Sequence, residues 1–535
     1  MRQTILPPTW IPLRHPLAWG LGFLSLLGLG TWPLIRADEV RRPNLLMVVS
    51  DDQSWPHCGI YGTPHLKTPS FDRIAREGVL FTHAFCPASQ CSPSRAALLT
   101  GQNIWQLREA GTQASLFPND IPTYPDLLEA AGYQVGYTGK PWGPGSWKAG
   151  HRARNPAGHE FNSRRLTPPT SEISKIDYAA NFSEFLQDKP NEKPFCFWFG
   201  CYEPHRNFER GSALRSGKTP DQIKVPPFYP DQPNVREDLL DYFLEIEWFD
   251  QQLGKMIAIL EQAGELEHTL ILVTSDNGMP FPRTKATLYE SGTRVPLAIR
   301  WPQRIKGGRV LGNLTSLIDL APTLLEAVGL EALPNMSGQS LWPLLSGRTG
   351  PEKQPGRSHI LLGKERHNHA RADNLGYPER AIRTDRYLYI HNLKPDRWPM
   401  GDPPHFRCHT KMKNPTKEFI LSQQTEAAIT PLFHLTYGKR PAREFYDLHT
   451  DPHCLENRIH HPDHQETIRE LAETMTNELR EQGDPRMHAH GDIFDSYPFF
   501  GRIQPDLPGF KAWGQYNSDY WPYPGTLIPR LPKLR

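Results

Sequence analysis

Acidic and amide side chains stand directly after two short apolar runs of this sequence. Asp51 and Asp52 follow the run NLLMVVS, and Asp276 and Asn277 follow the run LILVTS. Carboxylate and amide oxygens are the hard ligands that Ca²⁺ and Mg²⁺ prefer, and neighbouring aspartates repel each other unless a cation lies between them. No cysteine or histidine pair with zinc spacing accompanies them. The four side chains are therefore predicted to bind one divalent hard cation.

A cysteine stands at the predicted beginning of a helix. In residues 91–101 (CSPSRAALLTG), Pro93 suits a first helical turn and Gly101 can end the helix. A helix N-terminus offers free N–H groups and a positive dipole, so Cys91 lies where a tetrahedral anion would bind, and Arg95 could clamp that anion. The same position lowers the pKa of a thiol, so a thiolate nucleophile is one alternative and a buried structural cysteine is another.

Two further apolar runs end in polar residues. The run QVGYT leads into Gly139 and Lys140, and the run FCFWFG leads toward Glu203, His205 and Arg206. Any one of these residues alone is better explained as a turn or cap residue. Four runs that all end in this way indicate a common site, because ligands of an α/β sheet bind beyond the carboxyl ends of its strands.

The elements that must position these side chains are buried strands that alternate with helices. The strands are predicted over residues 44–50, 134–138, 195–200 and 270–274. The helices between them are predicted over 69–77, 125–131 and 239–263. This alternation is typical of an α/β protein whose mainly parallel sheet is covered by helices on both faces.

Composition narrows the function further. The chain has 535 residues, with 60 Lys and Arg against 58 Asp and Glu, and a net charge of +2. A general nucleic-acid or membrane-surface binder would need a basic excess, so neither partner is expected. The 54 prolines are about twice the usual proportion and indicate many rigid loops in a globular protein.

The first 37 residues are predicted to be a secretory signal. Arg2 and Arg14 precede the apolar run LAWGLGFLSLLGLGTW, which is shorter than the roughly 20 apolar residues of a spanning helix. The mature protein is therefore expected to be exported to a periplasmic, secreted or lysosome-like compartment, without a membrane anchor. Export permits disulfides among the seven cysteines, and one cysteine would remain unpaired.

A second region follows the predicted α/β part. Strands are expected over 359–363, 380–390 and 445–448, with a helix over 466–481. A polar loop between the first two strands contains three residues that could contact a ligand or simply face solvent: His367, His369 and Arg371. The last residues, from Phe499 onward, are rich in proline and aromatic rings that could stack on sugars or pack on the surface.

Several separated motifs resemble those of the type I sulfatases. The signature is Cys-x-Pro-Ser-Arg at 91–95 followed by Leu-Thr-Gly, and the resemblance extends from about Arg42 to at least Asp451. It implies an alkaline-phosphatase-like α/β fold, with a mixed, mostly parallel sheet between helices and a smaller C-terminal α+β domain that contains a short antiparallel sheet. It implies a catalytic domain over 38–375 and a C-terminal subdomain over 376–535.

The resemblance also implies roles for the residues above. In this family the cysteine is oxidised to formylglycine, whose hydrate is the nucleophile, so a formylglycine-generating or radical maturase is an expected partner during biosynthesis. The implied cation is Ca²⁺, with Mg²⁺ less favoured. Its implied ligands are Asp51, Asp52, Cys91, Asp276 and Asn277. The implied catalytic residues are Cys91, Arg95, Lys140, His205 and Lys285.

One position departs from the family pattern. Trp142, in Gly-Lys-Pro-Trp, stands where the family carries a histidine that helps to release sulfate. The sequence indicates no residue that replaces it.

The function implied by the resemblance is hydrolysis of sulfate esters or sulfamates of a sulfated saccharide. A phosphomonoester or phosphodiester hydrolase of the same superfamily is one alternative, although its alkaline phosphatase branch prefers Ser or Thr with histidine-rich zinc sites. A catalytically silent sulfoglycan-binding protein is the other alternative, and Trp142 is the residue that suggests it.

Overall fold

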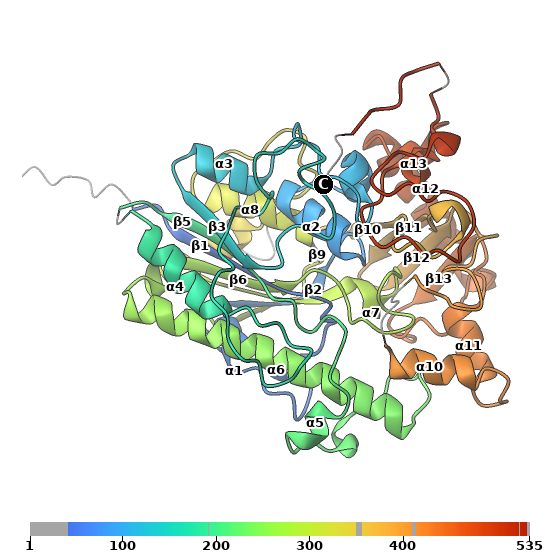
Figure 1. The fold of residues 1–535 in the computed structure, drawn as a ribbon, viewed down its shortest axis with the longest axis horizontal. Helices are drawn as coiled ribbons and strands as arrows, with labels where there is room; N and C mark the ends of the chain where they lie inside the picture. The colour runs from blue at the N-terminus through green and yellow to red at the C-terminus, as the bar shows by residue number, and fades with distance from the viewer. Residues whose placement is uncertain (1–40, 191, 349–355, 409–412, 524, 532–535) are drawn as a thin grey trace, which may run out of the picture. The chain divides into compact units, whose positions relative to one another are not determined.

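Parallel strands form the centre of the main sheet, as the alternation of apolar runs predicts. The computed structural model describes residues 41–190, 192–348, 356–408, 413–523 and 525–531, and the predicted signal segment lies outside them. Within these residues the sheet has nine strands in the order β4-β3-β5-β1-β6-β7-β2-β8, with β9 beside β2 (Figure 1). Only β7 runs against its neighbours, so the sheet is mixed and mostly parallel.

The bounds of these strands agree with the four predicted runs to within one residue at each end. The strands are β1 (Asn44–Ser50), β2 (Val79–Phe85), β3 (Gln134–Gly139), β4 (His159–Glu160), β5 (Phe195–Gly200), β6 (Thr269–Ser275), β7 (Arg294–Arg300), β8 (Arg309–Leu311) and β9 (Thr315–Ser316).

Helices cover both faces of the sheet because alternate residues of its buried strands point to opposite sides. Leu46 and Val48 of β1 belong to the same apolar cluster as Phe71 of α1, whereas Met47 of β1 clusters with Leu99 of α2. The first face carries α1 (Pro69–Glu77), α4 (Tyr178–Asp188) and α6 (Pro233–Gln262), and the second face carries α2 (Cys91–Thr100), α3 (Tyr124–Ala130) and α8 (Leu320–Ala327).

The smaller helices lie in the connections and in the C-terminal region. They are α5 (Ser212–Arg215), α7 (Glu290–Thr293), α9 (Trp342–Leu345), α10 (Pro415–Ser422), α11 (Thr430–Tyr437), α12 (Gln465–Glu481) and α13 (Ile493–Ser496). Among the described residues, no helix combines the length and the apolar character that a membrane span requires.

Strand register places the predicted site residues at one edge of the main sheet. Ser50 of β1 is paired with Ser275 of β6, so the two acidic pairs that follow these strands leave the sheet together. Gly139 of β3 is likewise paired with Gly200 of β5, so the loops that contain Lys140 and His205 begin side by side.

A second, antiparallel sheet contains four strands in the order β10-β11-β12-β13. Their bounds are β10 (His359–Lys364), β11 (Glu379–Thr384), β12 (Tyr387–Asn392) and β13 (Arg443–Asp447). The sheet begins before residue 376, where the C-terminal subdomain is predicted to start, and that boundary stays a prediction. Together the two sheets confirm the predicted fold class.

One predicted strand, residues 380–390, is in fact a hairpin. The chain turns after Thr384, whose hydroxyl accepts hydrogen bonds from the backbone N–H groups of Arg386 (3.3 Å) and Tyr387 (2.9 Å). A threonine hydroxyl that satisfies two nearby N–H groups stabilises a turn in place of a continuous ladder.

The structure contains none of the disulfides that export would permit among the seven cysteines. All seven cysteines are buried and unpaired. From Arg42 onward the described residues form one compact unit, and these thiols lie in its interior.

Candidate active site

Three aspartates and an asparagine meet where β1 and β6 end. Carboxylate oxygens of Asp51, Asp52 and Asp276 lie within 4.8 Å of one another, and all three side chains are buried. The backbone N–H of Asp52 donates to Asp276 Oδ1 (3.0 Å), which joins the two loops. Asn277 donates through Nδ2 to Asp52 Oδ1 (2.7 Å), but its buried Oδ1 accepts no hydrogen bond. Such an orphaned acceptor beside three carboxylates fits a hard cation.

Cys91 is the first residue of α2, which ends at Gly101 in the left-handed conformation (φ 67°), as predicted. Its Sγ lies 3.5 Å from Asp51 Oδ1 and 3.8 Å from Asp52 Oδ1. Burial, followed by the charge of Asp51, raises the pKa of the Cys91 thiol to about 12, although Lys140 and Lys285 act in the opposite direction. The expectation that the helix N-terminus lowers this pKa is therefore wrong, because desolvation of the thiolate is the larger effect.

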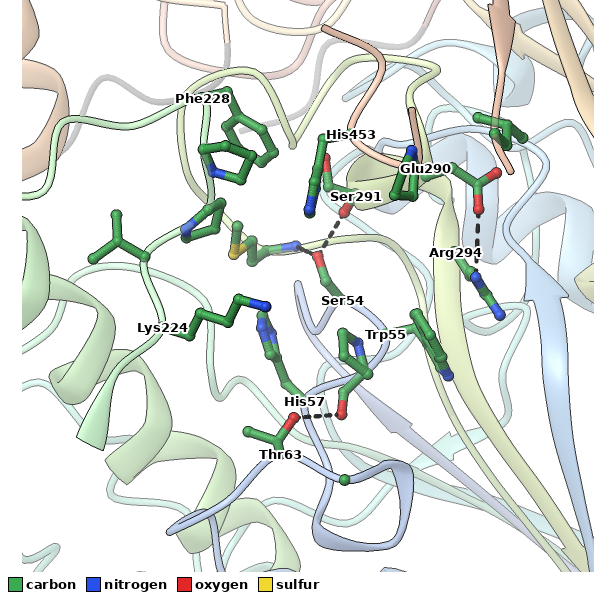
Figure 2. A pocket seen from close by; sticks show the side chains of 18 of the residues that line it. Ser54, Trp55, His57, Thr63, Lys224, Phe228, Glu290, Ser291, Arg294 and His453 are labelled. Carbon is green, nitrogen blue, oxygen red and sulfur yellow. Dashed lines mark hydrogen bonds and ion pairs between the residues drawn. The ribbon is translucent and has the colours of Figure 1, made fainter. Parts of the chain in front are cut away.

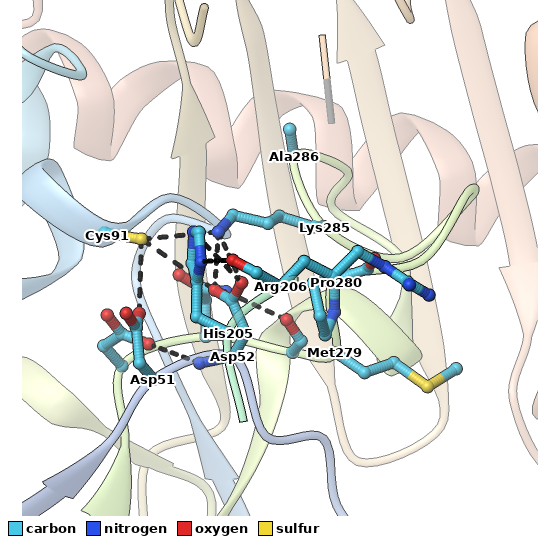
Figure 3. Close-up of polar contacts among 12 residues, drawn as sticks. Asp51, Asp52, Cys91, His205, Arg206, Met279, Pro280, Lys285 and Ala286 are labelled. Atoms are coloured by element: carbon cyan, nitrogen blue, oxygen red, sulfur yellow. Dashed lines mark hydrogen bonds and ion pairs between the residues drawn. The ribbon is translucent and has the colours of Figure 1, made fainter. Parts of the chain in front are cut away.

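Three basic side chains pair with the three aspartates, and Figure 3 shows one of these pairs, Lys285 with Asp52, beside Cys91. Lys140 Nζ lies 2.5 Å from Asp51 Oδ2, and Lys285 Nζ lies 2.5 Å from Asp52 Oδ2. Lys285 Nζ is also 3.5 Å from the Cys91 sulfur. These contacts bring Lys140 and Lys285 to the side chain at which the nucleophile is predicted.

Arg95 is the third basic group that pairs with an aspartate, and its side chain does not face solvent. Its Nε donates to Asp276 Oδ2 (2.7 Å) and its Nη1 donates to the carbonyl oxygen of Lys140 (2.8 Å). The guanidinium is fully buried and does not line the cavity described below. Arg95 thus orients Asp276 and the Lys140 backbone, and three carboxylates are matched by three cationic groups.

His205 approaches the cluster from the loop after β5. Its Nδ1 lies 2.6 Å from the carbonyl oxygen of Arg206, and because a carbonyl can only accept, Nδ1 holds the proton of this hydrogen bond. Its Nε2 lies 3.8 Å from Asp52 Oδ2. Burial and the charge of Lys285 lower the pKa of His205, against the opposing charges of Asp52 and Asp51.

A cavity of about 690 Å³ opens onto this cluster. Of the predicted site residues, it is lined by Asp51, Cys91, Lys140, His205 and Lys285. It is also lined by polar and aromatic residues that the sequence did not single out: Gln113, Tyr137, Trp147, Glu160, Asn162, Tyr202 and Asn368. These residues lie in loops and at strand ends, where neither periodicity nor a motif distinguishes a cavity wall from an ordinary surface.

The polar loop near residue 367 contributes one side chain to the cavity. His367 lines it, with Nδ1 hydrogen-bonded to the Cys408 carbonyl oxygen. His369 instead accepts from the backbone N–H of Gln504 (2.9 Å), and Arg371 donates to the carbonyl oxygen of Trp398 (2.8 Å). The last two side chains therefore have structural partners. The tail that begins at Phe499 reaches the cavity with Phe499 and Gly501.

Trp142 packs under the first turn of α2. Its indole Nε1 donates to the carbonyl oxygen of Ser92 (3.1 Å), and its ring meets Phe117 edge to face at a centroid distance of 5.1 Å. The ring is buried. Trp142 therefore supports the backbone beside Cys91, and an indole N–H offers no basic nitrogen to accept a proton.

We expect the Trp142→Phe substitution to lower the free energy of unfolding by about 1–2 kcal/mol, because the buried Ser92 carbonyl loses its indole donor. Urea unfolding would measure the change. The matched control is Trp147→Phe, since Trp147 is half-buried and its indole N–H donates no hydrogen bond within the described residues. Equal losses in both proteins would contradict a supporting role for the Trp142 indole.

Comparison with known proteins identifies the family of this chain. Residues 43–330 match the sulfatase family model, and residues 283–414 match the model of the C-terminal part of N-sulphoglucosamine sulphohydrolase. Human N-sulphoglucosamine sulphohydrolase is 28% identical over 499 residues, which cover 85% of this chain and 94% of that protein.

Two solved structures share the fold. One, in complex with its substrate D-glucosamine-2-N,6-O-disulfate, has a TM-score of 0.61 at 20% identity and covers 83% of this chain and 99% of that chain. The other, the phosphonate monoester hydrolase of Agrobacterium radiobacter, has a TM-score of 0.56 at 18% identity and covers 83% and 97%.

The fold and the site define an alkaline-phosphatase-like hydrolase. Because the family model spans more than half of its length, the chain belongs to the sulfatase family and is a sulfuric ester hydrolase. Within the family it is similar to N-sulphoglucosamine sulphohydrolase in its C-terminal part, as the second match shows.

Proposed function

We propose that this sulfatase hydrolyses sulfate esters or sulfamates of a saccharide through a formylglycine formed from Cys91. The observation that carries the proposal is the position of Cys91, at a helix N-terminus and within 4 Å of Asp51, Asp52 and Lys285. The raised thiol pKa argues against an unmodified thiolate nucleophile. An oxidising maturase of the formylglycine-generating or radical type would then act on the chain during its biosynthesis.

The residues present fit a divalent cation, proposed to be Ca²⁺ in preference to Mg²⁺. Its ligands would be the side chains of Asp51, Asp52, Asp276, Asn277 and the modified residue 91. A bound cation would polarise the sulfate oxygens and lower the pKa of a hydroxyl at residue 91. The three aspartates are already balanced by three basic groups, so the added ion gives the cluster a net positive charge that suits a sulfate group.

The side chains around residue 91 are proposed to have separate roles in the reaction. Lys140 and Lys285 line the cavity and would hold the negative oxygens of the sulfate group. Arg95 would keep Asp276 in position. His205 is proposed to protonate the departing oxygen or nitrogen through Nε2 in its doubly protonated form, because Nδ1 keeps its proton on the Arg206 carbonyl and fixes the ring.

Residue 91 would explain how the sulfate leaves. As an aldehyde hydrate it carries two hydroxyl groups on one carbon. One hydroxyl oxygen would bond to sulfur and pass its proton to Asp276, while the alcohol or amine departs with a proton from His205. Loss of a proton from the second hydroxyl then restores the aldehyde and breaks the carbon–oxygen bond to sulfate. The base for this second step stays unassigned, since Trp142 supplies no basic nitrogen.

A saccharide substrate is supported by the character of the cavity. Aromatic side chains of Tyr137 and Tyr202 can contact the C–H faces of a sugar ring, while Glu160 and Asn368 offer partners for its hydroxyls. The names of two relatives, N-sulphoglucosamine sulphohydrolase and an ulvan-active sulfatase, support the same class of substrate. The proposed signal segment would take the protein out of the cytoplasm, to where such glycans occur.

Paired phenol esters test the reaction class. We expect kcat/KM for the sulfate ester of a phenol to exceed that for its phosphate ester by at least about 10²-fold, because the phosphate dianion carries one more negative charge that must be desolvated as it enters the cavity. Phosphate preference would instead favour the phosphohydrolase alternative.

Mass spectrometry of the peptide that contains residue 91 tests the alternative of a catalytically silent sulfoglycan-binding protein. An intact thiol in protein from the native host would contradict formylglycine catalysis.

A further inference from the structure

A second cavity, of about 620 Å³, lies next to the loops that follow β1 and β6. Its floor includes Ser54 and Met279, which are joined by a hydrogen bond from the Met279 N–H to Ser54 Oγ (2.7 Å). Its walls come from residues 222–228 and from residues beyond β13. It shares no lining residue with the candidate active site, and its volume is in the range of small-molecule sites.

The cavity has a buried floor and an open rim. Ser54, Phe243 and Met279 are buried, whereas Lys224 and His453 are exposed. A ligand could therefore enter from solvent and still cover apolar surface. Figure 2 shows Lys224 and His57 directed into the same space, with Phe228 and His453 across from them.

Among the charged groups that line the cavity, the Lys224 ammonium forms no ion pair with a lining carboxylate. The lining carboxylate of Glu290 accepts from Arg383 Nε (2.9 Å) and lies 3.6 Å from Arg294 Nη1. The only other lining acid, Asp385, is exposed at the rim. Within the described part of the chain Lys224 forms no ion pair, so it can pair with an anion from solution.

The other lining groups are neutral hydrogen-bonding groups and apolar surface. Burial lowers the pKa of His57 to about 4, so this imidazole is neutral at physiological pH. Burial and the nearby Lys224 ammonium also lower the pKa of His453, against the charge of Asp451. Phe228 and Phe243 supply apolar walls. Neutral imidazoles suit sugar hydroxyls, and aromatic rings suit the C–H face of a pyranose.

We propose that this second cavity binds a saccharide unit that carries one anionic group, either sulfate or carboxylate, and that the anion pairs with Lys224. The site is separate from the hydrolytic one. It would allow the enzyme to hold a glycan without using the cavity at Cys91. The proposal does not depend on the proposed hydrolysis, which enters only in the choice of probe.

Equilibrium dialysis with labelled glucosamine N-sulfate tests the proposal, with the Cys91→Ala protein used to prevent turnover. We expect two bound equivalents in this protein. The added Lys224→Ala substitution should weaken one of them at least tenfold and leave the other unchanged. Unlabelled glucose, which has no anionic group, should displace neither. The matched control is Lys306→Ala, because Lys306 is also exposed but lies outside both cavities.

The outcomes separate this proposal from the proposed function. If Cys91→Ala binds one equivalent and Lys224→Ala removes it, the second site is supported and the saccharide site at residue 91 fails. If binding is unchanged by Lys224→Ala, the second site is overturned. With Cys91 intact, Lys224→Ala should change kcat/KM for a small sulfate ester less than twofold, and a larger loss would place Lys224 in the hydrolytic site and also overturn the proposal.

Discussion

The Cys91→Ser protein is expected to release about one equivalent of leaving group per chain and then stop. A serine hydroxyl at the start of α2 would occupy the place of one hydroxyl of the hydrate, near Lys285 and the aspartates. It could attack sulfur, but with one oxygen on its carbon it could not expel sulfate by re-forming an aldehyde. We expect steady-state turnover to fall by at least about 10⁴-fold, as in other enzymes that lose the group completing a covalent cycle.

Rapid mixing with a chromogenic sulfate ester would measure the burst, and mass spectrometry would detect sulfate on the peptide that contains residue 91. The Cys91→Ala protein is the control, because it has no oxygen or sulfur at that position and should show neither burst nor turnover. Continued turnover by the serine protein would show that release does not need the second hydroxyl. Turnover by the alanine protein would place the nucleophile elsewhere.

Removal of the divalent cation is expected to abolish activity while leaving the chain folded. Without the ion, Asp51, Asp52 and Asp276 still have Lys140, Lys285 and Arg95 as partners at 2.5–2.7 Å, so the carboxylates are not left unpaired. After treatment with a chelator we expect at least about a 10²-fold loss of kcat, because one preorganised source of positive charge disappears. Added Ca²⁺ should restore activity more effectively than Mg²⁺, which requires a stricter octahedral shell.

Removal of the cation should lower the free energy of unfolding only by the amount that cation binding contributes. A cation at 100 times its dissociation constant stabilises the folded state by about 2.7 kcal/mol, and thermal unfolding with and without Ca²⁺ would measure this shift. Unfolding of the chelated protein at room temperature would contradict the charge balance described here.

Substitution of an uncharged proposed ligand tests the cation site more directly. Asn277→Ala removes the orphaned Oδ1 acceptor without creating an unpaired charge, so we expect at least a tenfold increase in the Ca²⁺ concentration for half-maximal activity. The control is Glu160→Gln, because Glu160 lines the same cavity but is bound by the Tyr137 hydroxyl (2.5 Å) away from the three aspartates. An equal effect of both substitutions would contradict a cation ligand at Asn277.

Local sequence patterns predicted the elements that position the site. Continuous apolar runs such as 44–50 are typical of strands buried on both faces, and the polar residues after them predicted the strand ends. The Pro93 and Gly101 signals placed α2 with Cys91 as its first residue. These predictions succeeded because backbone preference and side-chain periodicity depend on residues close together in the chain.

Contacts between segments that lie far apart in the sequence could not be predicted in this way. The lowered thiol pKa expected for Cys91 was wrong because burial by the surrounding loops outweighs the helix dipole. The anion clamp expected of Arg95 is still a prediction, but its guanidinium is turned toward Asp276. The strand expected over 380–390 contains a turn, because Thr384 satisfies two N–H groups that a continuous strand would have paired differently.

The order of residues along the chain was therefore sufficient for the strand–helix alternation and the start of α2, while the resemblance to the sulfatases named the acidic, basic and thiol groups proposed for one site. Tertiary structure alone decided which of these groups touch, which line the cavity and which are held by structural partners. The physical reason is that a contact between β1 and β6, or between Lys285 and Cys91, depends on strand register and burial across 190 residues or more of chain. Those quantities are properties of the packed fold and have no local signal.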